Sequence, residues 1–271
     1  ADSISKYYSI NLKTGELNWK KNNKYPFNSE IKKNRDKIFV IDYKNTLRCF
    51  KINNGSECWN LQTEDSFTLS GIKYSLIISN DMVVFSNSIG DITAVDEQTG
   101  LILWQLPTQS SNIVNETYNF KNSKLVFDGN SIYFSNNKNE FYSIDAKTGT
   151  TNWTNEINST ITPIIINNLI FTVSEEGYLY VIEKNDGNII RISNLFMNYK
   201  EKIRKNLKPI GFAIGNLNLY LTNSNGDIIV SDLNSGSILN KKKIGNNLIS
   251  RPFIYNNSLF VVRNGSIVNY K

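Results

Sequence analysis

The chain has 271 residues, of which 40% are hydrophobic and 20% are charged, with a formal net charge of +6. No stretch approaches the ~20 consecutive apolar residues of a membrane-spanning helix, so the composition is that of a globular protein with a core. The sequence contains no histidine, which excludes Ser-His-Asp catalysis, Cys-His catalysis and histidine-ligated zinc. The lysines are scattered among many asparagines and isoleucines, so we do not interpret the positive charge as a nucleic-acid site.

One sequence unit recurs along the chain. Its clearest copy, Glu140–Trp153, is a strand that ends in aspartate, a turn with glycine, and a second strand that carries tryptophan. In chain order the glycines of the copies are Gly15, Gly55, Gly100, Gly149, Gly187 and Gly236. They lie 38 to 49 residues apart, which is the length of a propeller blade.

Each copy predicts four strands. Phe141–Ile144 alternates like a half-buried strand, and residues 149–153 continue as its hairpin partner. Upstream lies a further strand, such as Leu169–Val173, and before it a shorter one, such as Thr162–Ile166. The sequence therefore predicts an all-β fold, a β-propeller of four-stranded blades with about six blades present.

Aromatic and sulfur residues mark particular positions of the unit. The recurring tryptophans are Trp19, Trp59, Trp104 and Trp153, which Arg191 and Asn240 replace in two later copies. We predict that the tryptophans are structural and dock one blade on the next; stacking on a cofactor is the alternative. Cys49 and Cys58 fall on the third and fourth strands of one hairpin, where a frame in which Asp145 faces Thr150 sets them opposite each other. A disulfide and two reduced thiols both remain open.

A basic segment separates two predicted blades. Residues 198–208 contain five lysines and arginines. The segment can form a short helix with Tyr199, Ile203 and Leu207 on one stripe, and could attract phospholipid headgroups or nucleic acid. We favour a solvated loop, because propellers tolerate insertions between blades.

The unit resembles the PQQ-like, quinoprotein-type propeller repeat, whose signature Ala-x-Asp-x-x-x-Gly-x-x-x-Trp is matched by Ala94–Trp104. Within that group the chain looks most like the BamB family of outer-membrane β-barrel assembly lipoproteins. Three features carry this likeness: an end inside a third strand, Gly265–Lys271; the stretch Glu176–Gly187; and the long connection Leu106–Phe120. The resemblance implies a periplasmic, outer-membrane-associated scaffold without a cofactor, held by a lipid anchor outside this chain.

The resemblance also implies a ring of eight blades. We expect one domain over 1–271, with a half blade at 1–20, blades at 28–60, 67–105, 118–155, 161–192 and 208–240, and a last blade at 249–271. Seven third strands but only six complete pairs of first and second strands are recognisable. We favour a part of an eight-bladed ring; the alternative is that six units close on themselves, with residues 16–20 as the last outer strand.

The partner that the resemblance implies is a POTRA domain of the barrel-insertion protein. In the family, a loop with the pattern Leu-x-Leu-Arg-Gly contacts it. The matching positions here are Phe67, Leu69, Ser70 and Gly71, with Ser70 in place of the arginine. The loop Leu106–Phe120, whose only acid is Glu116, is a second candidate, and we expect the two loops to adjoin. The alternative is that Phe67 and Leu69 are core residues of a first strand.

A different function class, a quinoprotein (PQQ-dependent) oxidoreductase relic or a sugar-binding propeller, is the alternative to a protein scaffold. Quinoprotein dehydrogenases carry two adjacent cysteines over the cofactor, whereas Cys49 and Cys58 are nine positions apart. We therefore expect a protein that is not an enzyme, with no catalytic residue, cofactor or metal and no nucleic-acid partner.

Overall fold

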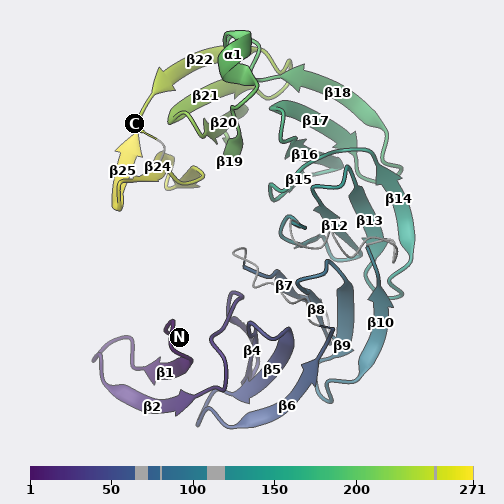
Figure 1. The fold of residues 1–271 in the computed structure, drawn as a ribbon, viewed down its shortest axis with the longest axis vertical. Coiled ribbons are helices and arrows are strands. Elements are labelled where there is room, and N and C mark those ends of the chain that lie inside the picture. Colours follow the sequence, from purple (N-terminus) through teal and green to yellow (C-terminus); the bar gives the residue numbers. More distant parts are fainter. Residues whose placement is uncertain (65–72, 80, 109–119, 247–248, 271) are drawn as a thin grey trace. The chain divides into compact units, whose positions relative to one another are not determined.

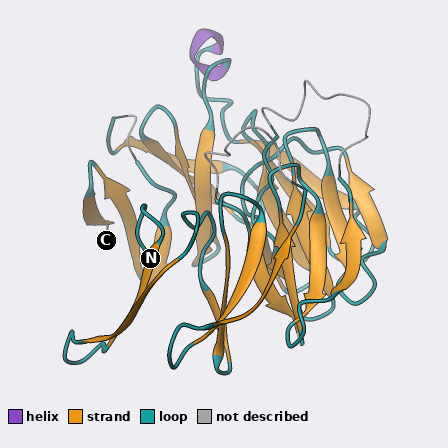
Figure 2. Cartoon of the chain, turned by 60° about the horizontal axis from the view of Figure 1, so that its bottom comes forward, coloured by secondary structure: helices purple, strands orange, loops and turns teal. Residues whose placement is uncertain are grey.

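The structure is a computed structural model that describes residues 1–64, 73–79, 81–108, 120–246 and 249–270. In these ranges it contains antiparallel sheets and a single short helix, α1 (Glu201–Arg204) (Figure 2). None of the described residues forms a helix long and apolar enough to cross a membrane. The predicted all-β class is confirmed.

The strands of each sheet follow one another in chain order (Figure 1). A two-stranded sheet contains β1 (Lys6–Ile10) and β2 (Leu17–Asn22). The next sheet contains β3 (Lys32–Asn34), β4 (Lys37–Ile41), β5 (Thr46–Lys51) and β6 (Glu57–Gln62). It is followed by β7 (Leu76–Ser79), β8 (Met82–Ser86), β9 (Ile92–Asp96) and β10 (Ile102–Leu106). Then come β11 (Val126–Phe127), β12 (Ser131–Ser135), β13 (Phe141–Asp145) and β14 (Thr151–Asn155).

The later sheets repeat the same plan. One contains β15 (Ile164–Ile166), β16 (Leu169–Val173), β17 (Tyr178–Glu183) and β18 (Ile189–Asn194). The next contains β19 (Pro209–Gly215), β20 (Asn218–Asn223), β21 (Asp227–Asp232) and β22 (Ile238–Lys243). The last contains β23 (Phe253–Tyr255), β24 (Ser258–Arg263) and β25 (Ser266–Tyr270). Within the described ranges, five sheets have the predicted four strands.

The turn between third and fourth strands is built by the aspartate of the repeat. Asp145 Oδ1 accepts hydrogen bonds from the backbone N–H groups of Lys147, at 3.0 Å, and Thr148, at 2.8 Å. Bonds of this kind, first those from Thr148, hold the pKa of Asp145 below its usual value. Gly149 ends the turn at φ +73°, a conformation that side chains disfavour.

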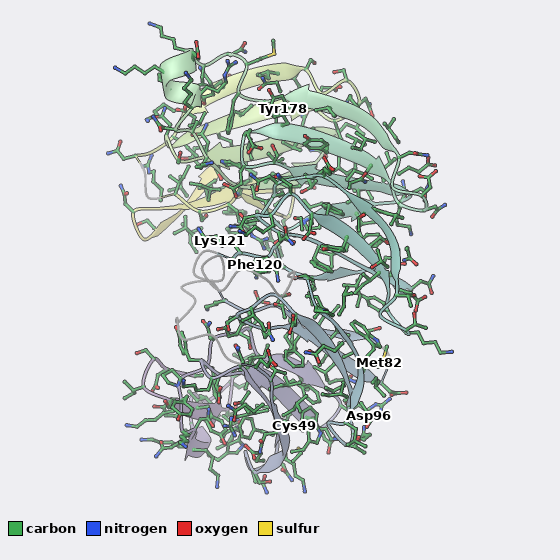
Figure 3. The ribbon with its side chains drawn as sticks, turned by 45° about the vertical axis from the view of Figure 1, so that its right-hand side comes forward. Cys49, Met82, Asp96, Phe120, Lys121 and Tyr178 are labelled. Carbon is green, nitrogen blue, oxygen red and sulfur yellow. The ribbon has the colours of Figure 1, made fainter. Side chains whose placement is uncertain are left out.

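A β-bulge follows this turn and corrects one prediction. The register of β5 and β6 shifts by one residue, so Cys49 pairs with Trp59 rather than facing Cys58. Both cysteines are free, Cys49 buried in the sheet β3–β6 (Figure 3) and Cys58 half-buried. Burial, and then the hydrogen bond with Cys58, raise the pKa of the Cys49 thiol. Sequence alternation missed the bulge because it assumes an unbroken period of two.

The chain divides into two compact units, which we describe separately. Unit 1 comprises Ala1–Tyr133 and Ile144–Thr151, and unit 2 comprises Phe134–Ser143 and Asn152–Lys271. In unit 1 one core cluster joins the facing sides of sheets β3–β6 and β7–β10, with Phe39 and Phe85 fully buried. In unit 2 a cluster joins β15–β18 to β19–β22 in the same way. The expected single domain and its blade boundaries stay predictions.

The basic segment, for which we favour a solvated loop, carries the one-turn helix α1, and the alternative of a helical stripe is wrong at one residue. Tyr199 and Leu207 are buried, but Ile203 is 45% exposed. The helix makes only one turn, so residues 199 and 207 lie outside it and pack independently of its period. Tyr199 Oη donates to Asp227 Oδ2 at 2.6 Å and accepts from Asn223 Nδ2 at 2.8 Å, which fixes the segment to the sheet β19–β22.

Candidate protein-binding surface

The structure places the four tryptophans at one equivalent position on the last strand of a sheet. Each indole Nε1 donates to a carbonyl oxygen in the following copy of the repeat. The acceptor residue lies three positions before the glycine of that copy. The donor–acceptor pairs are Trp19 to Ile52 at 2.8 Å, Trp59 to Glu97 at 3.1 Å, Trp104 to Ala146 at 3.1 Å and Trp153 to Lys184 at 3.1 Å. Each tryptophan thus joins its own sheet to the next turn along the chain.

The indole ring packs directly against the glycine of that turn. A Cβ atom at Gly100 would lie 2.6 Å from the Trp59 ring, closer than real Cβ contacts come. Glycine is therefore required at position 100 for two reasons: its φ is +74°, and a side chain would clash with the indole ring of Trp59. Trp104 is buried and the other three tryptophans are half-buried. This geometry favours the structural interpretation of the tryptophans over cofactor stacking.

Arg191 stands at the position of the tryptophan and makes the equivalent hydrogen bond. Its Nη2 donates to the carbonyl of Leu233 at 2.7 Å, and Leu233 is again three residues before the glycine, Gly236. Its Nη1 donates to the carbonyl of Asn234. A guanidinium group is planar and carries several donors, so it can replace an indole N–H at this position. The sequence signalled only the loss of tryptophan, not this replacement.

The predicted partner-binding residues Phe67, Leu69, Ser70, Gly71 and Glu116 lie outside the described residues. Their role stays a prediction. The structure does describe the stems from which both loops leave the sheets, and these stems lie in unit 1.

Both stems attach to the turn Asn87–Gly90, between β8 and β9. At the start of the loop that contains Phe67 and Leu69, which we call the first loop, Asn45 Nδ2 donates to the carbonyl of Glu64 at 2.6 Å and to Ser88 Oγ at 2.7 Å. The backbone N–H of Ser88 donates back to Asn45 Oδ1 at 3.2 Å. Asn45 is fully buried, so the start of the first loop is fixed to this turn by a buried amide.

The second loop attaches to the same turn at both of its ends. Thr108 Oγ1 donates to the carbonyl of Gly90 at 2.8 Å, and Asn122 Nδ2 donates to the same oxygen at 3.4 Å. The ring of Phe120, labelled in Figure 3, occupies the place of a side chain on Gly90, where a Cβ would lie 2.1 Å from it. Residues 73–75 and 120–123, which follow the two loops, line one small pocket of about 20 Å³. The stems of the two loops are therefore neighbours.

Hydrogen bonds also join the segments that open successive sheets. The N–H of Tyr74 donates to the carbonyl of Asn28 at 2.7 Å, and the N–H of Leu125 donates to Ser75 Oγ at 2.8 Å. We call residues 28–30, 73–75 and 120–125 the opening segments. They form a continuous row beside the two loop stems.

A carboxylate between two lysines lies on this row. Glu30 accepts from Lys124 Nζ and, at 3.0 Å, from Lys32 Nζ. The hydrogen bond with Lys124, then that with Lys32, lowers the pKa of Glu30 to about 2. Sequence reasoning missed this cluster because Glu30 and Lys124 are far apart in the chain, and no motif marks either of them.

The chain resembles known assembly factors in sequence. A family model described as outer membrane protein assembly factor BamB matches residues 3–193, more than half of the chain. The outer membrane protein assembly factor BamB of Shewanella oneidensis is 24% identical over 147 residues, which cover 51% of this chain and 34% of that protein. The matched stretch therefore spans about a third of that relative.

Solved structures share the fold. BamB from Moraxella catarrhalis has a TM-score of 0.80 at 17% identity, covering 98% of this chain and 78% of that one. A europium-containing methanol dehydrogenase has a TM-score of 0.62 at 11% identity, covering 94% and 78%. The computationally designed Ika8 protein has a TM-score of 0.62 at 14% identity, covering 99% and 91%. At these identities the likeness shows the fold alone, and it confirms the predicted β-propeller class.

Proposed function

This chain belongs to the BamB family of outer membrane protein assembly factors, and we propose that it is a non-catalytic, protein-binding scaffold of the outer-membrane β-barrel assembly machinery. In this proposal the protein works in the periplasm, associated with the outer membrane through a lipid anchor outside the present chain. Its partner is a POTRA domain of the barrel-insertion protein. The absence of histidine from the sequence is consistent with this role, because histidine is the side chain that most readily gains and loses a proton near neutral pH.

The observation that carries the proposal is the common anchorage of the two loop stems. A binding surface made of two loops needs them to be held together before the partner arrives, because ordering loops on binding costs affinity. Asn45 fixes one stem and Gly90 fixes the other to the turn 87–90. Phe67 and Leu69, the apolar residues of the family pattern, would then act as anchors in a polar rim.

Capture of a POTRA-domain protein tests the proposal. The change Phe67→Asp should abolish capture and leave the thermal midpoint nearly unchanged, because it puts a charge into an apolar contact without disturbing the core. The matched control is Leu101→Asp, which likewise replaces an apolar side chain by a carboxylate. Leu101 is 69% exposed and lies in the turn at the opposite end of sheet β7–β10. This control should bind as the unchanged protein does.

Two outcomes would contradict the proposal. If Phe67→Asp lowers both binding and the thermal midpoint strongly, Phe67 is a core residue of a first strand. If binding persists with the fold intact, the surface inherited from the family does not serve this protein.

A further inference from the structure

The basic segment 198–208 belongs to an insertion that the repeat does not need. In the equivalent connection, from β14 to β15, only three residues (158–160) separate two buried isoleucines. In the connection from β18 to β19, eleven residues (196–206) separate the buried Leu195 from the buried Leu207. The longer connection contains four lysines and arginines, and the shorter one contains none. The repeat itself therefore accounts for neither the length nor the charge of the insertion.

Contacts with unit 2 fix the insertion at its base. The backbone N–H of Leu195 donates to the carbonyl of Gly177 at 3.0 Å, and the N–H of Lys208 donates to Ser224 Oγ at 2.9 Å. Between these ends the buried Tyr199 hydroxyl group is bound to the sheet β19–β22. The helix α1 (purple in Figure 2) thus stands on a fixed base, beyond the ends of the strands. Its side chains are presented to a partner without the cost of ordering a loop.

Nearby carboxylates cancel only part of the positive charge of the insertion. Lys205 pairs with Glu201 at 2.9 Å, and Lys208 pairs with Glu175 at 3.7 Å. A third carboxylate, Glu176, lines the same small hollow beside α1. Three further cations are exposed and enter no ion pair in the part of the chain that the structure describes. They are Lys200, Lys202 and Arg204.

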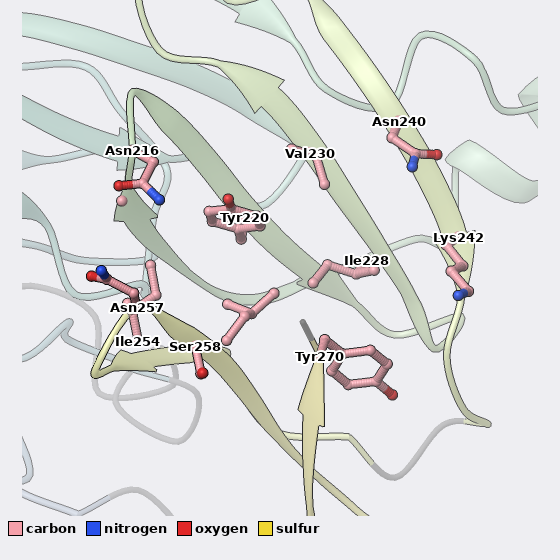
Figure 4. Close-up of a pocket in the computed structure, with 12 residues that line it drawn as sticks. Asn216, Tyr220, Ile228, Val230, Asn240, Lys242, Ile254, Asn257, Ser258 and Tyr270 are labelled. Atoms are coloured by element: carbon pink, nitrogen blue, oxygen red, sulfur yellow. The ribbon is translucent and has the colours of Figure 1, made fainter.

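Strand β22 adds two lysines on the side of the insertion. Lys241 Nζ lies 4.2 Å from the centre of the Tyr199 ring, and Lys243 Nζ donates to the carbonyl of Asn225. Lys242, between them, faces the other side of β22, where Figure 4 shows it. We call Lys200, Lys202, Arg204, Lys241 and Lys243 the basic surface.

The chemistry of the basic surface favours a layer of lipid headgroups over nucleic acid. Two apolar side chains of the insertion are exposed, Ile203 by 45% and Met197 by 62%, and such side chains can enter the boundary between headgroups and acyl chains. The aromatic rings of the insertion, Phe196 and Tyr199, are both buried. Neither ring is therefore free to stack on a base, which is the usual means of binding single strands.

We propose that the basic surface binds the anionic phospholipid headgroups of a membrane. The cations attract the lipid phosphates, and Ile203 on α1 enters the interface beside them. Each basic side chain close to an anionic surface strengthens binding about fivefold. The contact is weak and reversible, and it gives unit 2 a preferred side toward the membrane. It involves no residue of the two loops of the proposed partner surface, so either proposal can fail without the other.

Co-sedimentation of the whole chain with lipid vesicles tests the proposal. The protein should bind vesicles that contain phosphatidylglycerol, should not bind vesicles of phosphatidylcholine alone, and should be released by high salt. The triple change Lys200→Gln, Lys202→Gln and Arg204→Gln should weaken binding about 100-fold, because it removes three cations. The thermal midpoint should stay unchanged, since these side chains are exposed and make no ion pair.

A matched triple change separates this surface from the net charge of the whole chain. Lys13→Gln, Lys21→Gln and Lys33→Gln remove the same charge at three exposed lysines of unit 1 and should change binding less than about twofold. Lys242→Gln, on the other side of β22, should also have little effect.

Four results would overturn the proposal. They are absence of binding to the phosphatidylglycerol vesicles, equal loss of binding in the two triple variants, equal binding to phosphatidylcholine alone, and displacement by inorganic phosphate at matched ionic strength. Tighter binding to single-stranded RNA than to the vesicles, lost in the Lys200, Lys202 and Arg204 variant, would assign the surface to nucleic acid instead.

Discussion

Trp104 shows at the scale of one residue how neighbouring sheets are joined. It is 9% exposed, donates to the carbonyl of Ala146, and covers Gly149. Trp104→Ala should lower the free energy of unfolding by about 3–5 kcal/mol, because it leaves a cavity and an unpaired carbonyl. Urea unfolding followed by circular dichroism measures this. Leu101→Ala, at a residue that is 69% exposed, should stay within about 0.5 kcal/mol of the unchanged protein. Equal effects of the two substitutions would contradict the role of Trp104 in joining the sheets.

Glu30 gives a prediction about pH. Its pKa is lowered from 4.5 to about 2, so its contribution to stability is fully present above pH 4.5 and is lost as the pH falls through about 2. The side chain is 43% exposed, so solvent screening keeps the contribution to stability small. A carboxyl ¹³C titration should place the Glu30 midpoint near pH 2. Lys124→Met should move it toward 4.5, and a midpoint near 4.5 in the unchanged protein would contradict the cluster.

Single residues were predictable where a repeat marked them. The four tryptophans could be found because each follows a glycine at a fixed distance. Arg191 could not be recognised as their substitute, because its role depends on a carbonyl 42 residues away. Cys58 was misplaced by one position because a bulge is invisible to a period of two.

At the scale of an element, the turn 87–90 holds the two loop stems. Asn45 occupies φ +54° and ties Glu64 to Ser88, so Asn45→Gly removes the side chain and keeps the backbone conformation. It should lower the free energy of unfolding by about 1–3 kcal/mol, since buried partners lose their bonds, and should weaken capture of the POTRA-domain protein severalfold. Asn167→Gly, at the same φ of 54°, is the control and should leave capture unchanged. Undiminished capture by Asn45→Gly would show that this anchorage does not serve binding.

Secondary-structure elements could be predicted from local sequence signals. The predictions failed where tertiary packing decides the conformation. Third and fourth strands have the Asp-to-Gly turn between them, and the structure has strands on both sides of it. The stripe through Tyr199, Ile203 and Leu207 assumed a longer helix than the single turn of α1. Tyr199 is instead held by its hydroxyl group between Asn223 and Asp227, which no local pattern announces.

At the scale of the whole molecule, the repeat period alone predicted the propeller class. The predicted partner surface rests instead on Phe67, Leu69, Ser70, Gly71 and Glu116, which lie outside the described residues. Repetition specifies a fold, whereas a binding loop is by nature the part that does not repeat. The eight-bladed ring likewise stays a prediction.

Hydrogen–deuterium exchange of the chain, alone and bound to a soluble POTRA-domain protein, tests the central claim most directly. The scaffold proposal predicts a complex in which amides slow down in residues 62–75 and 106–123, the two loops with their stems, because a bound partner excludes water there. Protection confined to other segments, or no complex at all, would contradict it.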